Sequence, residues 1–376
     1  METAADSPGE PTPGSPLTLC HLIASNFAGG PEKQILESSA RLVESGWRVS
    51  IASFLEGRSG VEIVDRARER GLETFLIDTR SPFSPDAIRQ LRKHLDTTGS
   101  DVLLTHGYKS NVVGTFATRG TAVRKIPVVR GFTAEDWKVR LYEVIDRIFL
   151  RRAQQVIAVS EATRDMLVRE GLRAERIEVL QNAVDCEREV EALDLRAEFD
   201  LPEDAVVAVA AGRLSPEKSH RHLVEAAAQL DPRVQVLIFG SGREETALRN
   251  QIDELGLADR VHLAGFRKDV LRCLAGADLV VNPSLTEGLP NVVLEAMAVR
   301  TAVVATDVGG VSELVLPQRT GWLVPAGDVT SLAAAMSEAV SDAELRRAMA
   351  QAGREHVERT FSFTEQTRRY RRFLAG

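Results

Sequence analysis

The chain has 376 residues, 44% of them hydrophobic and 27% charged, which is the composition of a globular protein long enough for two domains. Its net charge of −7 argues against generic nucleic-acid binding, and three widely spaced cysteines argue against a disulfide framework or a structural zinc site. No uncharged apolar run approaches the ~20 residues that cross a bilayer. We therefore expect a cytoplasmic protein.

The chain begins with a polar segment and continues with alternating elements. Residues 1–16 are rich in Pro, Gly, Ser and acidic side chains, so we expect a disordered tail rather than a signal peptide. Short apolar runs then alternate with helical patterns, and the expected strands are 17–23, 48–52, 74–77, 102–105, 127–129 and 156–160. This α/β alternation predicts a doubly wound, Rossmann-like parallel sheet covered by helices on both faces.

A second series of strands follows a charged, helix-like stretch at 186–199. The expected strands are 205–211, 234–239, 261–264, 279–282 and 302–305. We place a domain boundary near residue 190, with a first domain at 17–190, a second at 191–356 and a last helix at 357–376. Doubly wound sheets bind ligands at the carboxyl ends of their strands, so a cleft between two such domains is the expected site.

The loop after strand 205–211 carries a glycine and two cations, Gly212, Arg213 and Lys218. An Arg fork and a Lys point charge together suit a diphosphate leaving group. The alternative is two solvated surface cations, but their position after a buried strand favours the diphosphate.

Two further loops follow buried strands. Gly240 and Gly242 fail the dinucleotide fingerprint because Glu245 takes the place of its third glycine. These glycines indicate either a turn that approaches a ligand or a plain structural turn, and both interpretations stay open. Phe266 belongs to a turn where main-chain groups would contact the edge of a nucleobase.

The most informative segment places two glutamates around a helix start. It contains Glu287, Gly288, Leu289, Pro290, Asn291 and Glu295. Pro290 suits a first helical turn, so Glu287 belongs to the loop and Glu295 to the second turn. A helix N-terminus favours a diphosphate, and carboxylates suit paired sugar hydroxyls. Glu287 alone is equally explained as a carboxylate stabilised by the helix dipole, whereas Glu295 lies among apolar neighbours and needs a partner.

These motifs occur in an order that resembles glycosyltransferase family 4. The resemblance covers nearly all of residues 17–376, and the last of its motifs is the run from Thr306 to Glu313. It implies a GT-B-fold retaining glycosyltransferase, similar to bacterial exopolysaccharide-type sugar transferases, with a last helix that crosses back to the first domain. The motifs are specific for the class and much less specific for the substrate.

The resemblance also implies roles for single residues. Glu295 would hold the ribose hydroxyls of the donor, Glu287 would lie beside the donor sugar, and Arg213 with Lys218 would bind the diphosphate. Backbone N–H groups from Gly288 to Asn291 would support it. In the first domain, the loop with Gly29 and Gly30 resembles the glycine loop that approaches donor and acceptor.

The first domain contains two further candidate site residues, His106 and Arg130. His106 ends the fourth expected strand beside a glycine, which makes it a candidate catalytic residue, although a lone histidine is more often structural. Arg130 stands where many family members have a histidine. Because arginine does not titrate near neutrality, it would instead bind a carboxylate or phosphate on donor or acceptor.

The segment 138–152 interleaves apolar and basic residues. It predicts either a helix that docks on an anionic membrane surface, which suits a lipid-linked acceptor, or a core-facing helix with a solvated basic face. In the first case the protein would associate peripherally with the inner face of the cytoplasmic membrane.

The expected function is transfer of a hexosyl unit from a nucleotide diphosphate sugar to an acceptor hydroxyl, with retention. The cationic loop and a helix N-terminus supply positive charge, so we expect no metal or other cofactor. Two alternatives remain: a GT-B nucleotide-sugar epimerase, and a non-catalytic nucleotide-sugar sensor or scaffold. The donor base and sugar, the acceptor and the oligomeric state are not specified by these motifs.

Overall fold

The computed structural model describes residues 16–24, 29–55, 62–78, 84–131 and 137–375, with side chains of the last range described from residue 144 onward. Nearly all of the predicted tail 1–16 lies outside these residues, as do residues 25–28 of the predicted glycine loop. The chain forms two compact units, residues 1–127 with 367–376, and residues 128–366. These units differ from the predicted domains, whose boundary near residue 190 stays a prediction.

The first sheet has seven strands in the order β3-β2-β1-β4-β5-β6-β7. Its strands are β1 (Thr18–Ile23), β2 (Arg48–Leu55), β3 (Glu73–Asp78), β4 (Val102–His106), β5 (Arg124–Val129), β6 (Val156–Ala158) and β7 (Ile177–Val179). The helices between them are α1 (Gly30–Glu44), α2 (Glu62–Glu69), α3 (Pro85–Thr98), α4 (Tyr108–Ala117), α5 (Trp137–Arg151) and α6 (Glu161–Arg169), followed by the short 3₁₀ helix Ala174–Arg176.

Apolar strand residues explain why this sheet forms. β1 pairs in parallel with β2 and with β4, and Leu19, Leu22 and Ile51 on the first two strands are fully buried. Strands buried on both faces carry continuous apolar runs, which is the pattern that the sequence shows. The helices begin at ordinary caps, such as Ser160, whose hydroxyl accepts from the N–H of Thr163 at the start of α6.

The second sheet has six strands in the order β10-β9-β8-β11-β12-β13, and its recorded pairs are parallel. Its strands are β8 (Val206–Ala211), β9 (Val234–Phe239), β10 (Val261–Gly265), β11 (Leu279–Asn282), β12 (Ala302–Thr306) and β13 (Trp322–Val324). The helices are α7 (Leu195–Glu198), α8 (His220–Ala227), α9 (Glu245–Glu254), α10 (Val270–Gly276), α11 (Asn291–Ala298), α12 (Val311–Leu314), α13 (Val329–Ser341) and α14 (Ala343–Thr360).

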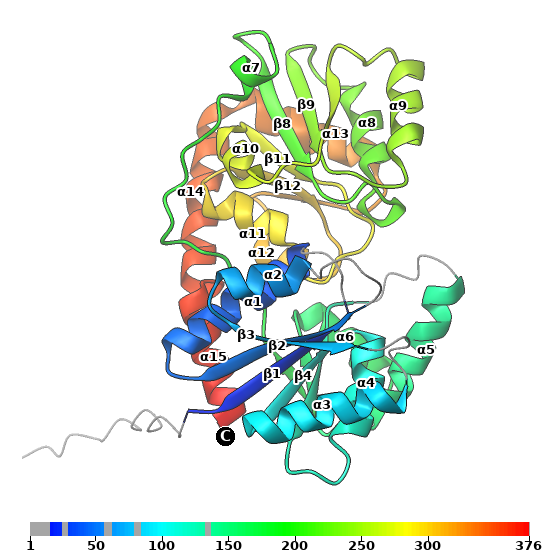
Figure 1. The fold of residues 1–376 in the computed structure, drawn as a ribbon. Coiled ribbons are helices and arrows are strands. Elements are labelled where there is room, and N and C mark those ends of the chain that lie inside the picture. The colour runs from blue at the N-terminus through cyan, green and yellow to red at the C-terminus, as the bar shows by residue number, and fades with distance from the viewer. Residues whose placement is uncertain (1–15, 25–28, 56–61, 79–83, 132–136, 376) are drawn as a thin grey trace, which may run out of the picture. The chain divides into compact units, whose positions relative to one another are not determined.

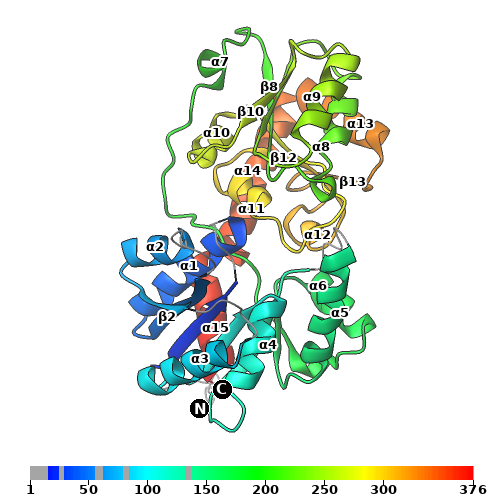
Figure 2. The same ribbon diagram turned by 45° about the vertical axis from the view of Figure 1, so that its right-hand side comes forward.

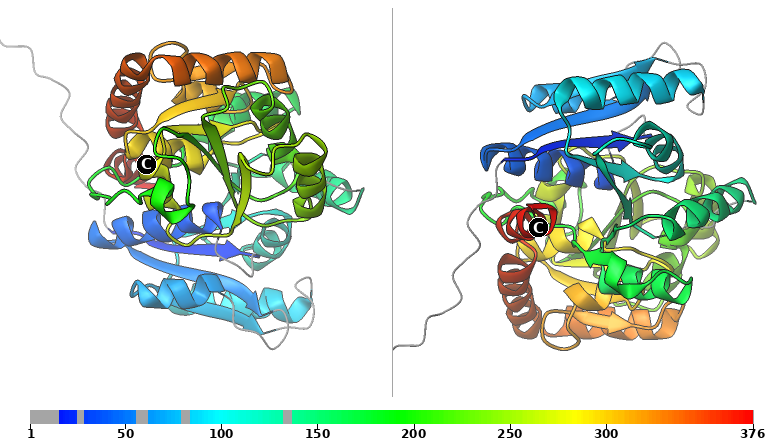
Figure 3. Two further views of the ribbon diagram at one scale, coloured as in Figure 1. Left: turned by 90° about the horizontal axis from the view of Figure 1, so that it is seen from above. Right: turned by 90° about the horizontal axis from the view of Figure 1, so that it is seen from below.

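Helices cover both faces of this second sheet. Side chains of α8, α9 and α13 join the core cluster on one face, and α10 and α11 lie on the other (Figures 1 and 2). Helices α13 and α14 follow each other along the outside of the sheet, as the views from above and below show (Figure 3). The chain therefore contains two doubly wound parallel sheets, and the predicted α/β fold class is confirmed.

The strand order of the second sheet places a topological switch point between β8 and β11. β9 and β10 lie on one side of β8, whereas β11 and β12 lie on the other. The loops that follow β8 and β11 thus leave neighbouring strands in opposite directions, at a topological switch point. Both loops carry residues that the sequence singled out.

The last helix, α15 (Phe363–Ala375), ends in the first unit, to which residues 367–376 belong. The Arg124 guanidinium donates to the carbonyl of Leu374 within that unit. The predicted return of the C-terminal helix is confirmed.

None of the helices in the described part of the chain has the length and apolar character that a bilayer span requires.

Candidate functional site

Backbone hydrogen bonds hold together three loops at the carboxyl end of the second sheet. They run from the N–H of Gly212 to the carbonyl of Phe239 (2.9 Å), from Leu214 to Ser241 (3.0 Å), and from Gly240 to Gly265 (2.8 Å). The loops after β8, β9 and β10 therefore continue the ladder of the sheet beyond its strands, which gives them a fixed backbone.

Gly240 and Gly242 are required by the backbone of the neighbouring loop. A Cβ atom at Gly240 would lie 1.8 Å from the carbonyl oxygen of Gly212, and one at Gly242 would lie 2.2 Å from that of Leu214. Gly240 also has a φ of 150°, a backbone conformation that residues other than glycine rarely adopt. These distances favour the structural-turn interpretation, and the predicted contact of both glycines with a donor stays a prediction.

Lys218 and Glu287, predicted as site residues from separate loops, form an ion pair. The Lys218 Nζ atom lies 2.7 Å from Oε1 of Glu287, which also accepts a 2.7 Å hydrogen bond from the Ser284 hydroxyl. The Glu287 side chain is 7% exposed and that of Lys218 is 26% exposed. Burying a carboxylate costs free energy unless it is paired and hydrogen-bonded, so these two contacts stabilise Glu287 in its position.

The two switch-point loops also meet through their backbones. The N–H of Leu285, after β11, donates to the carbonyl of Glu217 at 2.8 Å, in the short 3₁₀ helix Pro216–Lys218 after β8. This backbone hydrogen bond fixes the distance between the two loops that carry Lys218 and Glu287.

The helix after Glu287 begins one residue later than predicted. Pro290 is the N-cap of α11 with a φ of −73°, and Asn291 is the first helical residue. Pro290 thus lies just before the first turn, because its fixed φ suits the entry to the helix. Glu295 falls in the second turn, as predicted, and is half-buried.

The backbone of Gly288 is closely surrounded. A Cβ atom at this position would lie 2.2 Å from the carbonyl oxygen of Arg130. The carbonyl of Gly288 accepts a 2.8 Å hydrogen bond from the N–H of Gly310, and a Cβ atom at Gly309 would lie 1.9 Å from the carbonyl oxygen of Glu287. Glycine is therefore needed at 288 and 309 by packing of the chain on itself.

The Arg130 side chain is half-buried and contacts an amide. Its Nη1 donates to Oδ1 of Asn182 at 3.1 Å, and Nδ2 of Asn182 donates to the carbonyl of Leu289 at 2.9 Å and to Oδ1 of Asn291 at 3.0 Å. Asn182 is 8% exposed. Sequence reasoning missed Asn182, whose only signal was a polar residue three positions after the end of β7 at Val179.

Arg213 and Phe266 are exposed residues of the loops after β8 and β10, and Phe266 is 69% exposed. Their predicted contacts with diphosphate and base are not tested by this geometry. The backbones of both loops are hydrogen-bonded to the segment 239–241 that lies between them.

In the first unit, His106 ends β4 and contacts a second histidine. Its Nε2 lies 3.0 Å from Nδ1 of His21 on β1, and the two rings are stacked with centroids 5.2 Å apart. At the start of α1, the N–H of Gly29 donates to the carboxylate of Glu32 at 3.0 Å, and Gly30 is exposed. The roles that the resemblance implies for Gly29, Gly30 and His106 stay predictions.

His220 is a buried titratable residue beside the Lys218 loop. It begins α8, is 3% exposed, and its Nδ1 has no hydrogen-bond partner among the described residues. Burial, assisted by the charge of Lys218 and opposed by Glu217, lowers the pKa of His220 to about 4. The imidazole is therefore neutral at physiological pH. The sequence placed His220 in the motif but gave it no role.

The low pKa of His220 predicts acid sensitivity of the fold. The unfolded imidazole, with a pKa near 6.5, binds a proton before the folded one does, so stability falls as the pH drops from 6.5 toward 4. The His220 contribution should cost roughly 2 kcal/mol at pH 5 relative to pH 7. Urea unfolding at both pH values should show a smaller difference for His220→Phe than for the wild type. Equal differences would contradict the pKa assignment.

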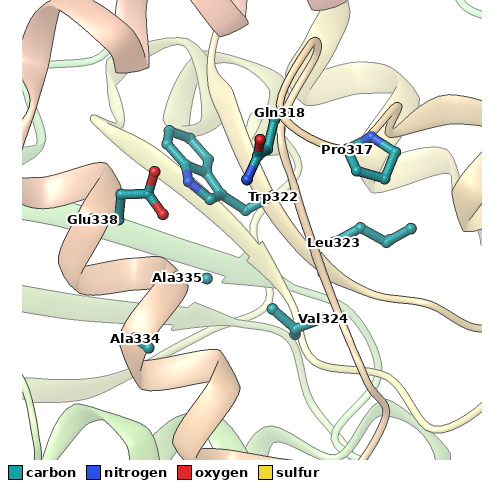
Figure 4. Close-up of a pocket in the computed structure, with 8 residues that line it drawn as sticks. All are labelled: Pro317, Gln318, Trp322, Leu323, Val324, Ala334, Ala335 and Glu338. Carbon is teal, nitrogen blue, oxygen red and sulfur yellow. The ribbon is translucent and has the colours of Figure 1, made fainter.

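A pocket of about 340 Å³ lies elsewhere, at the edge strand β13 (Figure 4). It is lined by Pro317, Gln318, Trp322, Leu323, Val324, Ala334, Ala335 and Glu338. Its charged lining residue is a carboxylate, which is unsuited to an anionic ligand. The pocket contains no predicted site residue, and the chemistry of the switch-point loops makes those loops the stronger candidate site.

Two doubly wound parallel sheets of seven and six strands are the architecture of the GT-B class of glycosyltransferase. Two family models match the chain: Glycosyl transferases group 1 over residues 192–356 and Glycosyltransferase Family 4 over residues 28–188. The chain belongs to this glycosyltransferase family, and the predicted membership is confirmed.

The chain is also similar in sequence to curated glycosyltransferases and in fold to a solved structure. The lipopolysaccharide core biosynthesis glycosyltransferase LpsE of Rhizobium meliloti is 36% identical over 48% of this chain and 53% of LpsE. The chain thus spans about half the length of LpsE. The putative glycosyltransferase EpsD of Bacillus subtilis is 28% identical over 83% of this chain and 84% of EpsD. Anabaena HepE, solved in complex with UDP-glucose, has the same fold, with a TM-score of 0.85 and 23% identity over 95% of this chain and 99% of HepE.

Proposed function

We propose that this protein is a retaining glycosyltransferase that moves a hexosyl unit from a nucleoside diphosphate sugar to an acceptor hydroxyl of a glycan, a lipid-linked sugar or a small molecule. The observation that carries the proposal is the Lys218–Glu287 ion pair, 2.7 Å long, between the two switch-point loops and just before the N-terminus of α11. A cation and a helix N-terminus suit the diphosphate, and a carboxylate suits the hydroxyls of the sugar.

In the proposed reaction, the bond between the anomeric carbon and the diphosphate oxygen breaks while the acceptor oxygen bonds to that carbon on the same face. The proton of the acceptor hydroxyl passes to the departing phosphate. Lys218 and Arg213 neutralise the charge that develops on the diphosphate. Glu287 orients the sugar, and Glu295 holds the ribose hydroxyls.

A thermal-shift panel tests this proposal and narrows the donor. We expect one of UDP, GDP and ADP to raise the melting temperature more than the other two, because a ligand that binds the folded state stabilises it. The UDP-glucose complex of HepE and the UDP-Gal donor in the name of an Escherichia coli relative favour UDP. The corresponding sugar nucleotides are then incubated with and without acceptors. Turnover without acceptor would favour an epimerase, and binding without turnover would favour a sensor. The anomeric configuration of the product, read by NMR, tests retention.

We also propose that catalysis needs no metal, because Lys218, Arg213 and the α11 N-terminus supply the positive charge at the leaving group. Initial rates in excess EDTA should equal those in its absence. Added Mg²⁺ after chelation serves as the control. A rate that EDTA abolishes and Mg²⁺ restores would contradict the metal-independent mechanism.

A lipid-linked acceptor is supported by one face of α5. Val144 is 51% exposed and Ile148, one turn later, is 44% exposed, and Arg151 and Arg152 at the end of the helix are exposed. The side chains of residues 138–143 lie outside the described residues. Apolar side chains beside exposed arginines suit an anionic membrane surface, which would place the reaction at the inner face of the cytoplasmic membrane.

Vesicle sedimentation tests this membrane contact. The protein should bind phosphatidylglycerol vesicles and bind phosphatidylcholine vesicles less, and Ile148→Glu should weaken binding to the anionic vesicles by about tenfold. Leu255→Glu is a matched control, since Leu255 is 43% exposed and lies at the C-cap of α9, a helix of the second sheet. Equal binding by both variants would count against α5 as the contact.

A further inference from the structure

The proposed diphosphate loop, residues 288–291, is held by one carboxamide. Oδ1 of Asn182 accepts from Arg130, and its Nδ2 donates to Leu289 and to Asn291 at 2.9 and 3.0 Å. The partners fix the orientation of this amide, because a guanidinium only donates and a carbonyl only accepts. A side chain that both donates and accepts is therefore required at position 182.

Nδ2 of Asn182 donates to two acceptor oxygens at the start of α11, the carbonyl of Leu289 and Oδ1 of Asn291. Leu289 and Asn291 stand on either side of Pro290, which has no N–H. Acceptor oxygens directed at an anion site oppose a phosphate, whereas the backbone N–H groups of a first helical turn attract it. Both oxygens accept hydrogen bonds from Asn182. The N–H groups of the first turn are then the backbone groups at the start of α11 that can bind an anion.

Arg130 supports the same loop in two ways. Its carbonyl oxygen would lie 2.2 Å from a Cβ atom at Gly288, so its backbone is in close contact with the loop. Its guanidinium donates to the oxygen of the amide that holds the loop's other end. The sequence predicted that Arg130 binds a carboxylate or phosphate on donor or acceptor directly, and its contact with Asn182 offers an indirect role instead.

We propose that Asn182 is a positioning residue for the diphosphate loop and that Arg130 acts on donor affinity through Asn182. This inference rests on the proposed donor site. It gives the arginine at position 130 a role, because a long, permanently charged fork there reaches the amide while its backbone packs against Gly288.

The test measures UDP binding by calorimetry and loop order by amide hydrogen exchange. Asn182→Leu should weaken UDP binding by about tenfold, the effect of losing two hydrogen bonds to the loop, and should speed exchange of the amides in residues 288–293. Asn182→Ala is a second variant in case the larger side chain prevents folding. Gln181→Leu is the matched control, because it removes the neighbouring amide, which donates to Glu313 at 2.6 Å.

A double-mutant cycle separates the indirect role of Arg130 from a direct one. Arg130→Met should weaken UDP binding several-fold in the wild type and change it by less than about twofold in the Asn182→Leu background, because residues that act through each other are not additive. Additive effects would show that Arg130 contacts the donor itself and would overturn its assignment.

The remaining outcomes are distinct. Wild-type protein that binds no nucleoside diphosphate contradicts the proposed function and, with it, the role of Asn182. If the wild type binds UDP and the Asn182 variants bind it equally well, the role of Asn182 alone is overturned. Faster exchange across the whole chain, in Gln181→Leu as well, would show a general loss of stability and would also contradict the positioning role.

Discussion

Replacement of Lys218 by methionine is expected to lower kcat/KM for the donor by about a hundredfold or more, because it removes a fixed charge from the leaving diphosphate. Methionine keeps much of the length of the side chain and removes the charge. UDP affinity should fall as well, since the diphosphate is present in the bound nucleotide and in the transition state. The measurement is steady-state transfer with the donor that the nucleotide panel selects, together with UDP calorimetry.

Stability must be measured beside activity in this variant. Glu287 is 7% exposed, and Lys218→Met leaves its carboxylate with the Ser284 hydroxyl as its recorded partner. Breaking a fully buried ion pair costs about 3–5 kcal/mol, and we expect a smaller loss here because the Lys218 side chain is 26% exposed. Lys93→Met, at an exposed position on α3, is the control for loss of one lysine. A folded Lys218→Met variant with full turnover would contradict the role of Lys218.

Local patterns in the sequence were sufficient to predict the fold. Apolar runs such as 234–239 form strands because a buried parallel strand needs no polar alternation. The same reasoning placed Lys218 and Glu287 after strand ends, and the structure brings these residues together although 69 positions separate them. The topology of a doubly wound sheet makes this possible, because its carboxyl ends share one edge.

Contacts between distant segments could not be predicted in this way. That Gly240 meets the carbonyl of Gly212 depends on the spacing of two loops, which no local pattern encodes. The same holds for Asn182, whose partners are more than 50 residues away on both sides, and for the pairing of His106 with His21. A residue's type shows what it can bind, and the assembled fold decides which of its possible partners lies within reach.

Replacement of Glu287 by glutamine should separate donor binding from transfer. Glutamine keeps an oxygen that can accept from Ser284 and Lys218, so we expect the fold to persist. It removes a negative charge 2.7 Å from the lysine, and the lysine then meets the diphosphate without a competing carboxylate. UDP affinity should therefore stay equal or increase, in contrast to its loss in Lys218→Met.

Transfer by Glu287→Gln should nevertheless fall by about a hundredfold, because the carboxylate that orients the donor sugar is a stronger acceptor for its hydroxyls than an amide. Calorimetry with UDP and transfer rates with the sugar nucleotide are measured on the same preparation, with Glu203→Gln at an exposed position as the control. A loss of UDP affinity with an unchanged transfer rate would reverse the expected pattern. It would mean that Glu287 serves only to hold Lys218 in place, and another group would have to orient the sugar.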